Sequence, residues 1–239
     1  MKSAGIIGGI APASTIAYYE QILAAWRERR PDGSAPSIVI NSIDLKTLLE
    51  LAGAKRFDEL TAYLLRELQR LAGAGVDFAL FASNTPHIVF ANLRRRSPIP
   101  LLSIVEAACD EARSRGLKRL GLFGTRFTMQ GRFYRDVFTK AGIELVVPPD
   151  DEQQWVHDKY LSELVKENFL DETRDGLLAI ARRLHERDHI DALILGGTEL
   201  PLILNDDKAL PIPMLDTTKI HVARVVDELL PGFRSSVDG

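Results

Sequence analysis

The sequence predicts an α/β protein built on parallel sheets, and three observations support this prediction. Short apolar runs rich in strand-forming residues recur along the chain. Most of them are separated by longer segments whose apolar residues have the spacing of amphipathic helices. The short runs are continuously apolar, which is typical of strands in parallel sheets that helices cover on both faces.

Eight apolar runs are predicted to form the strands, at residues 4–9, 37–42, 76–83, 99–104, 119–124, 143–148, 191–197 and 212–216. A helix is expected over 15–30, beginning beside Ser14 and Thr15, because these residue types are good N-caps. A second helix is expected over 56–75, where the segment ends in glycines as helices commonly do.

An internal repeat indicates that the chain contains two copies of one βα arrangement. The segment "GIIGGIAPASTIAYYEQIL" aligns with "GLFGTRFTMQGRFYRDVFT", and "FASNTPHIV" aligns with "LGGTELPLI". The matched pairs are Gly5 with Gly121, Gly8 with Gly124 and Tyr18 with Tyr134, and a shift of one position places Thr85 on Thr198. Each half therefore has a strand that ends in a Gly-rich turn and a later strand that ends in a Thr-containing turn. Ligands of open α/β sheets collect outside the carboxyl ends of strands, so these turns predict a ligand cleft.

Composition restricts the possible functions. The 239 residues are 46% hydrophobic and 26% charged, which is typical of a globular protein and not of a disordered one. A net charge of −3 gives no basic field, so we expect no nucleic-acid partner. Cys109 is the single cysteine, which excludes an intrachain disulfide and a thiol metal site and favours the cytoplasm. We expect no metal and no cofactor.

The N-terminal segment is similar to a short signal peptide, because Lys2 precedes "SAGIIGGIAPAS". Its apolar part is short, contains Gly-Gly and continues directly into an amphipathic segment, so we interpret it as the first strand. No apolar run approaches the ~20 residues that span a bilayer, and we expect no membrane partner.

The Gly-rich turn at 5–12 favours a small anion over a nucleotide. It has neither the G-x-G-x-x-G spacing of a dinucleotide site nor the lysine of a P-loop. Backbone N–H groups at a helix start can still bind a carboxylate. We therefore predict that Ala11 and Ser14 belong to a site for a small carboxylate.

The turn "SNTPH" and its repeat partner carry the other candidate side chains. Ser83 lacks the flanking glycine of a nucleophile elbow. Asn84, Thr85 and Thr198 can donate hydrogen bonds to a carboxylate, although Asn and Thr also favour such turns for local reasons. Glu199 is either an acid or base or a first-turn carboxylate favoured by the helix dipole, and His87 is interpreted as a packing histidine.

These motifs resemble the signature turns of the aspartate/glutamate racemase family. The similarity rests on "GIIGGIAPASTIAYYEQI", "SNTPH" and "GGTELPLIL", and it extends through "LFGTRFTM" to "PMLDTTKIHVARVV". It implies two flavodoxin-like α/β domains related by pseudo-twofold symmetry, with a cleft between them. It also implies 1,1-proton transfer on an acidic amino acid without pyridoxal phosphate, and a homodimer.

The two catalytic cysteines of that family are absent from this chain. Ser83 occupies the first cysteine position and Gly197 the second. A serine hydroxyl is a far weaker acid than a thiol near pKa 8.5, and glycine has no side chain, so two-thiol racemisation is not expected. Cys109 lies in a helical pattern away from either turn and does not replace them.

Three interpretations remain open from the sequence. The first is a racemase-family protein, nominally an amino-acid racemase, that binds a small amino acid or carboxylate in the interdomain cleft. The second is a pseudoenzyme that binds an amino acid or dicarboxylate, or else an isomerase or lyase that uses other bases. The third is that a substitution was introduced to trap a ligand. A polar second base near Gly197 would favour a working enzyme. The repeat predicts one domain from 1–104 plus 214–239, with a returning C-terminal helix, and a second domain from 105–213.

Overall fold

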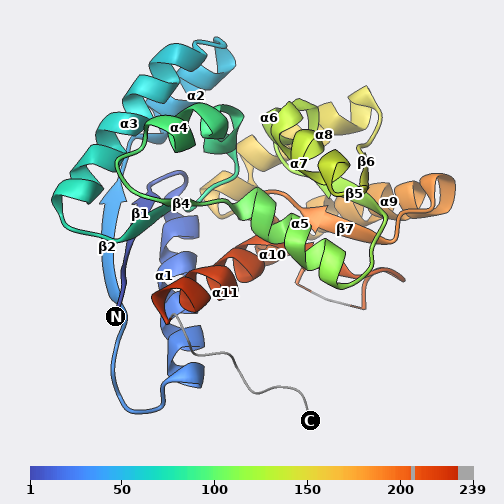
Figure 1. The fold of residues 1–239 in the computed structure, drawn as a ribbon. Coiled ribbons are helices and arrows are strands. Elements are labelled where there is room, and N and C mark those ends of the chain that lie inside the picture. Colours follow the sequence, from blue (N-terminus) through green and yellow to red (C-terminus); the bar gives the residue numbers. More distant parts are fainter. Residues whose placement is uncertain (206–207, 231–239) are drawn as a thin grey trace. The chain divides into compact units, whose positions relative to one another are not determined.

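The computed structural model describes residues 1–205 and 208–230. Contacts within the chain divide it into two compact units (Figure 1). Unit 1 comprises Met1–Ile104 and the chain from His221 onward, and unit 2 comprises Val105–Ile220. The expected boundary at 213/214 lies before this division, because the strand at Met214–Asp216 pairs within the sheet of unit 2. Residues 231–239 of the expected returning segment lie outside the described residues.

The elements of unit 1 alternate between a strand and one or two helices. In chain order they are β1 (Ser3–Gly8), α1 (Pro12–Arg29), β2 (Ser37–Ser42), α2 (Leu45–Gly53), α3 (Phe57–Gly73), β3 (Phe78–Phe81), the 3₁₀ helix η1 (Thr85–Val89), α4 (Phe90–Arg96) and β4 (Leu101–Leu102). Helix α11 (Thr217–Leu229) begins in unit 2 and continues into unit 1.

Unit 2 follows the same alternation with additional helices. Its elements are α5 (Ile104–Ser114), β5 (Arg119–Phe123), α6 (Arg126–Gln130), α7 (Arg132–Lys140), β6 (Glu144–Val146), α8 (Asp150–Ser162), the 3₁₀ helix η2 (Leu164–Lys166), α9 (Asp171–Asp188), β7 (Ala192–Leu195), α10 (Leu200–Ile203) and β8 (Met214–Asp216).

The predicted parallel α/β class is confirmed. The first sheet has the order β2-β1-β3-β4 and the second has the order β6-β5-β7-β8, with every neighbouring pair parallel. The two orders correspond strand for strand, in agreement with the internal repeat. Each of the eight predicted apolar runs overlaps one of these strands.

Alternate residues of the strands in unit 1 form its hydrophobic core. Ala4 and Ile6 of β1 and Phe78 and Leu80 of β3 face α1 and α11. The two helices contribute Tyr18, Ile22, Trp26, Val222, Val225, Val226 and Leu229 to the same core. An ion pair between Arg29 and Asp227 also joins α1 to α11.

Helix α1 begins earlier than the sequence predicted. Its N-cap is Ala11, which has extended backbone and no side-chain cap, and Pro12 occupies the first turn. Ser14 and Thr15 therefore lie inside the helix, and the prediction that they cap it was wrong. Proline is favoured at a first helical position because its fixed φ suits the helix and its missing N–H is not needed there.

Helix α3 ends as the sequence predicted. Its last residue is Gly73, and Gly75 follows with a φ of 78°. Positive φ is the conformation in which glycine commonly terminates helices. In the described part of the chain, no helix is both long enough and apolar enough to cross a membrane.

Candidate functional site

Two turns of unit 1 meet at the carboxyl edge of its sheet. Strands β1 and β3 are neighbours with Ile7 opposite Phe81, and the Ala82 N–H donates to the Ile7 carbonyl over 3.0 Å. The Gly-rich turn after β1 and the turn after β3 therefore begin at the same level of the sheet. Ligands of α/β sheets bind at this edge.

The predicted ligand residues of unit 1 are all buried at these turns. Ala11 and Ser14 stand at the start of α1 and are 3% and 1% exposed. Ser83, Asn84 and Thr85 follow β3 and are also buried. Five predicted residues thus belong to two neighbouring turns, with the N-terminus of α1 beside them.

The turn after β1 is held tightly against α1. The Thr15 hydroxyl accepts a hydrogen bond of 2.8 Å from the Gly9 N–H. A Cβ at Gly8 would lie 2.5 Å from Cγ2 of Thr15, so only glycine leaves room for this contact. The same relation recurs in unit 2, where a Cβ at Gly124 would lie 2.8 Å from Cβ of Thr128.

His87 supports the turn after β3 as a packed, neutral residue. Its Nδ1 lies 3.2 Å from the Asn84 carbonyl, and its ring stacks on Phe90 with centroids 4.5 Å apart. Burial lowers the pKa of His87 to about 3. This environment agrees with the interpretation of His87 as a packing histidine.

In unit 2, the corresponding turn follows β7. The Gly196 N–H donates to the Phe123 carbonyl at the end of β5 over 2.8 Å. Gly197, Thr198 and Glu199 come next and lead into α10. Thr198 and Glu199 are 5% and 2% exposed.

Tyr160 of α8 fills the space where a side chain at position 197 would stand. A Cβ at Gly197 would lie 2.5 Å from both Cε2 and the phenolic oxygen of Tyr160. The Tyr160 hydroxyl donates to Oε2 of Glu199, and the Thr198 hydroxyl donates to the same oxygen over 3.0 Å. Burial and the adjacent Glu199 raise the pKa of Tyr160 well above its ordinary value.

Sequence reasoning missed Tyr160. It lies in a helix 37 positions before Gly197, so no local motif connects the two residues. Only Gly197 could have indicated such a neighbour, because a buried glycine leaves space that a nearby side chain fills. The sequence does not show which side chain that is.

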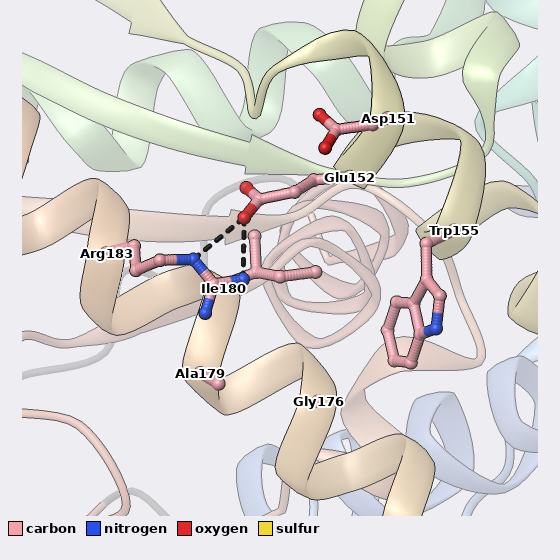
Figure 2. A pocket seen from close by; sticks show the side chains of 7 residues that line it. All are labelled: Asp151, Glu152, Trp155, Gly176, Ala179, Ile180 and Arg183. Carbon is pink, nitrogen blue, oxygen red and sulfur yellow. Dashed lines mark hydrogen bonds and ion pairs between the residues drawn. The ribbon is translucent and has the colours of Figure 1, made fainter.

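One pocket of unit 2 lies apart from these turns. It occupies about 510 Å³ between α8 and α9 and is lined by Asp151, Glu152, Trp155, Gly176, Ala179, Ile180 and Arg183 (Figure 2). Arg183 donates to Glu152 over 2.8 Å, so these two charges are paired, and Asp151 is a third charged side chain in the lining. None of the predicted site residues lines it.

A second pocket of about 450 Å³ includes Cys109, with Glu106, Asp110, Arg113, Val137, Lys140 and Ala141. Burial raises the pKa of the Cys109 thiol, so the thiol stays protonated. None of the predicted site residues lines this pocket. Across residues 1–205 and 208–230, no three His, Cys, Asp or Glu side chains gather as a metal site would require.

The fold and its turns define a class of protein with two matching parallel α/β units, each with a Gly-rich turn and a Thr-containing turn at the carboxyl edge of its sheet. The Asp/Glu/Hydantoin racemase family model matches residues 7–225. The chain therefore belongs to this family.

Solved structures show the same fold over almost the whole chain. A Yersinia pestis protein assigned as an Asp/Glu racemase is 29% identical, with a TM-score of 0.88 over 96% of this chain and 100% of that one. An aspartate racemase homologue from Pyrococcus horikoshii is 30% identical, with a TM-score of 0.82 over 96% and 99%. Among sequence relatives, glutamate racemase of Aquifex aeolicus is 28% identical over 142 residues, with coverage of 56% of this chain and 50% of that protein.

Proposed function

We propose that this protein binds a small amino acid or other small carboxylate at the turns that hold Ala11, Ser14, Ser83, Asn84 and Thr85. The observation that carries the proposal is the pairing of β1 with β3, which brings both turns to one edge of the sheet. The α1 N-terminus adds a favourable dipole for an anion. Membership of a racemase family supports an amino acid as the ligand class.

The proposed ligand residue of unit 2 is Thr198. Its hydroxyl donates to Glu199, so it would have to rotate or use its lone pairs to contact a ligand. Whether Thr198 and Thr85 serve one cleft stays a prediction, as do the homodimer and the cytoplasmic location. Sedimentation of the full chain at twice the mass of one chain would support the homodimer, and sedimentation at a single mass would contradict it.

The proposed chemistry excludes the two-thiol route of racemisation. Position 83 carries a hydroxyl and position 197 carries no side chain. The space beside Gly197 holds polar groups, because the Tyr160 hydroxyl lies there and donates to the Glu199 carboxylate. This arrangement favours an isomerase-family enzyme that moves protons with oxygen groups, without pyridoxal phosphate.

A pseudoenzyme that only binds the carboxylate is the second candidate. The absence of both thiols favours it, because binding requires only the hydrogen-bonding turns. Incubation of each enantiomer of aspartate and glutamate in deuterated water distinguishes the candidates. Incorporation of deuterium at the α-carbon supports the enzyme, and binding without incorporation supports the pseudoenzyme.

Calorimetric titration with L-aspartate tests the binding site. We expect Thr85→Ala to weaken binding about 10- to 100-fold, since a hydrogen bond to a charged group contributes about 1.5–3 kcal/mol. Thr139→Ala is the matched control, because Thr139 is exposed on α7. Equal affinities for the two variants would remove the turn after β3 from the site.

A further inference from the structure

The phenolic oxygen of Tyr160 lies where the side chain of residue 197 would begin. The ring comes from α8, and a Cβ at Gly197 would lie within 2.5 Å of the phenolic oxygen. The Tyr160 ring therefore fills the space on the Cβ side of Gly197. A group able to donate and accept a proton occupies that space.

Glu199 completes a pair of oxygen groups at this turn. Its Oε2 accepts from both Tyr160 and Thr198, and all three side chains are at least nine-tenths buried. Hydrogen bonds to an ionised acceptor are stronger than neutral ones, and low local dielectric strengthens them further. The carboxylate is thus placed to accept the phenolic proton at the moment when the phenolic oxygen takes another.

We infer that Tyr160 and Glu199 form one proton-transfer pair, with the phenolic oxygen taking the place of the side chain that Gly197 lacks. This inference rests on the proposed function, because it requires that the bound amino acid or similar carboxylate contacts Thr198 at the turn after β7.

The proposed step moves two protons and leaves every atom accounted for. The Cα–H bond of the bound acid breaks, and its proton passes to the phenolic oxygen of Tyr160. The original phenolic proton passes at the same time to the Glu199 carboxylate. The electron pair of the broken bond stays on the substrate and delocalises into its carboxyl group.

The return step has a stereochemical consequence. The same phenol gives a proton back from the side on which it removed one, so the configuration at the α-carbon is retained. In deuterated water, the protons on Tyr160 and Glu199 exchange with solvent while the carbanion is still bound, so the phenolic oxygen returns a deuteron. The result is α-deuterium incorporation without loss of optical rotation.

The experiment compares the full-length chain with Tyr160→Phe and Glu199→Gln, using L-aspartate and L-glutamate as probes in deuterated water. Proton NMR follows the α-hydrogen, polarimetry follows the configuration, and calorimetry gives the affinity. Tyr63→Phe, on α3 of unit 1, is the matched control for the loss of a phenolic hydroxyl.

We expect the unmodified chain and Tyr63→Phe to exchange the α-hydrogen with unchanged rotation. Tyr160→Phe and Glu199→Gln should each reduce the exchange rate by about 10²-fold or more, which is typical of a lost general acid or base. Both should keep the affinity for L-aspartate, since a loss of binding would show that the pair only supports the turn. If Tyr160→Phe does not fold, the isosteric Glu199→Gln still tests the pair.

Three results would overturn the inference. Binding by the unmodified chain without exchange would leave only the binding proposal standing. Exchange that survives both substitutions would exclude the pair, and racemisation at the rate of exchange would exclude transfer at one face. Failure of the unmodified chain to bind either acid would instead contradict the proposed function for acidic amino acids.

Discussion

The relation between Gly197 and Tyr160 is a packing constraint as well as a chemical one. Protein interiors are close-packed, so a side chain can be added at Gly197 only if the Tyr160 ring moves. The ring also donates to Glu199, and its displacement would break that hydrogen bond. A thiol cannot be restored at position 197 without changing position 160.

Gly197→Cys should therefore destabilise the protein by about 1–3 kcal/mol, the usual effect of overpacking. Urea unfolding measures the loss. Ser83→Cys is the control, because the two side chains are similar in size, and we expect it to change stability by less than about 1.5 kcal/mol.

A double-mutant cycle checks that the cause is Tyr160. Tyr160→Ala alone should be destabilising, since it removes a buried ring. In the double variant Tyr160→Ala/Gly197→Cys, the new side chain enters the space that the ring vacated. The free energy of unfolding should therefore fall by less than the sum of the two single losses. Strict additivity would contradict the steric explanation.

At the scale of elements, each sheet depends on a strand–turn–helix junction in which a glycine meets a threonine of the following helix. In unit 1 the pair is Gly8 and Thr15, and in unit 2 it is Gly124 and Thr128. The Thr15 hydroxyl also accepts the Gly9 N–H. This junction sets where α1 begins and so positions Ala11 and Ser14.

Gly8→Ala is expected to lower the free energy of unfolding by about 1–3 kcal/mol, because the new methyl group must displace Thr15. It should also weaken L-aspartate binding, since the α1 N-terminus moves with Thr15. Urea unfolding and calorimetry measure the two effects.

Gly73→Ala is the matched control for that substitution. A Cβ at Gly73 meets nothing within 4 Å, and the residue lies in the last turn of α3. Alanine has the higher helix propensity, so we expect neutral or slightly increased stability. Equal losses for the two variants would show that the Thr15 contact is not the cause.

At the scale of the whole molecule, two histidines from distant parts of the chain make folding sensitive to acid. His221 of α11 has its Nδ1 2.9 Å from the Tyr18 hydroxyl of α1, and it is fully buried. Burial lowers the pKa of His221 to about 3. His87 has a pKa of about 3 because of burial, with smaller effects from His221 and the Arg94 cation.

The lowered pKa values of His87 and His221 determine how the free energy of unfolding changes with pH. The unfolded chain protonates each histidine below about pH 6.5, whereas the folded chain keeps both neutral until about pH 3. The stability that they contribute is complete above pH 6.5 and is lost as the pH falls toward 3. At pH 5 each histidine lowers the free energy of unfolding by about 2 kcal/mol relative to its value above pH 6.5.

Urea unfolding at pH 7.5 and at pH 5.0 tests this prediction. His221→Gln should reduce the difference in unfolding free energy between the two pH values by about 2 kcal/mol, whatever it does to stability at pH 7.5. His189→Asn, at an exposed helix end, should leave the difference unchanged. An unchanged difference in His221→Gln would show that His221 is not protonated on unfolding in this range.

Much of the fold could be predicted from the sequence because local patterns report backbone structure directly. The eight apolar runs identified the strands, and the alignment of Gly8 with Gly124 anticipated two sheets of matching strand order. The loss of both thiols was also visible at Ser83 and Gly197. The start of α1 was misplaced because Ser14 and Thr15 suit a helix N-cap locally, whereas Pro12 and the contact of Thr15 with Gly9 place the cap at Ala11.

Only the tertiary structure decided what replaces the missing side chain at position 197. Tyr160 and Gly197 are joined by the packing of α8 against the end of β7, and no sequence period connects those two elements. The same holds for His221 and Tyr18, which meet because α11 packs on α1. The sequence by itself determined the family, the strands and the absent thiols, since these depend on residue type and local order. The oxygen pair of Tyr160 and Glu199 depends on contacts across 39 positions, which form only when the unit folds.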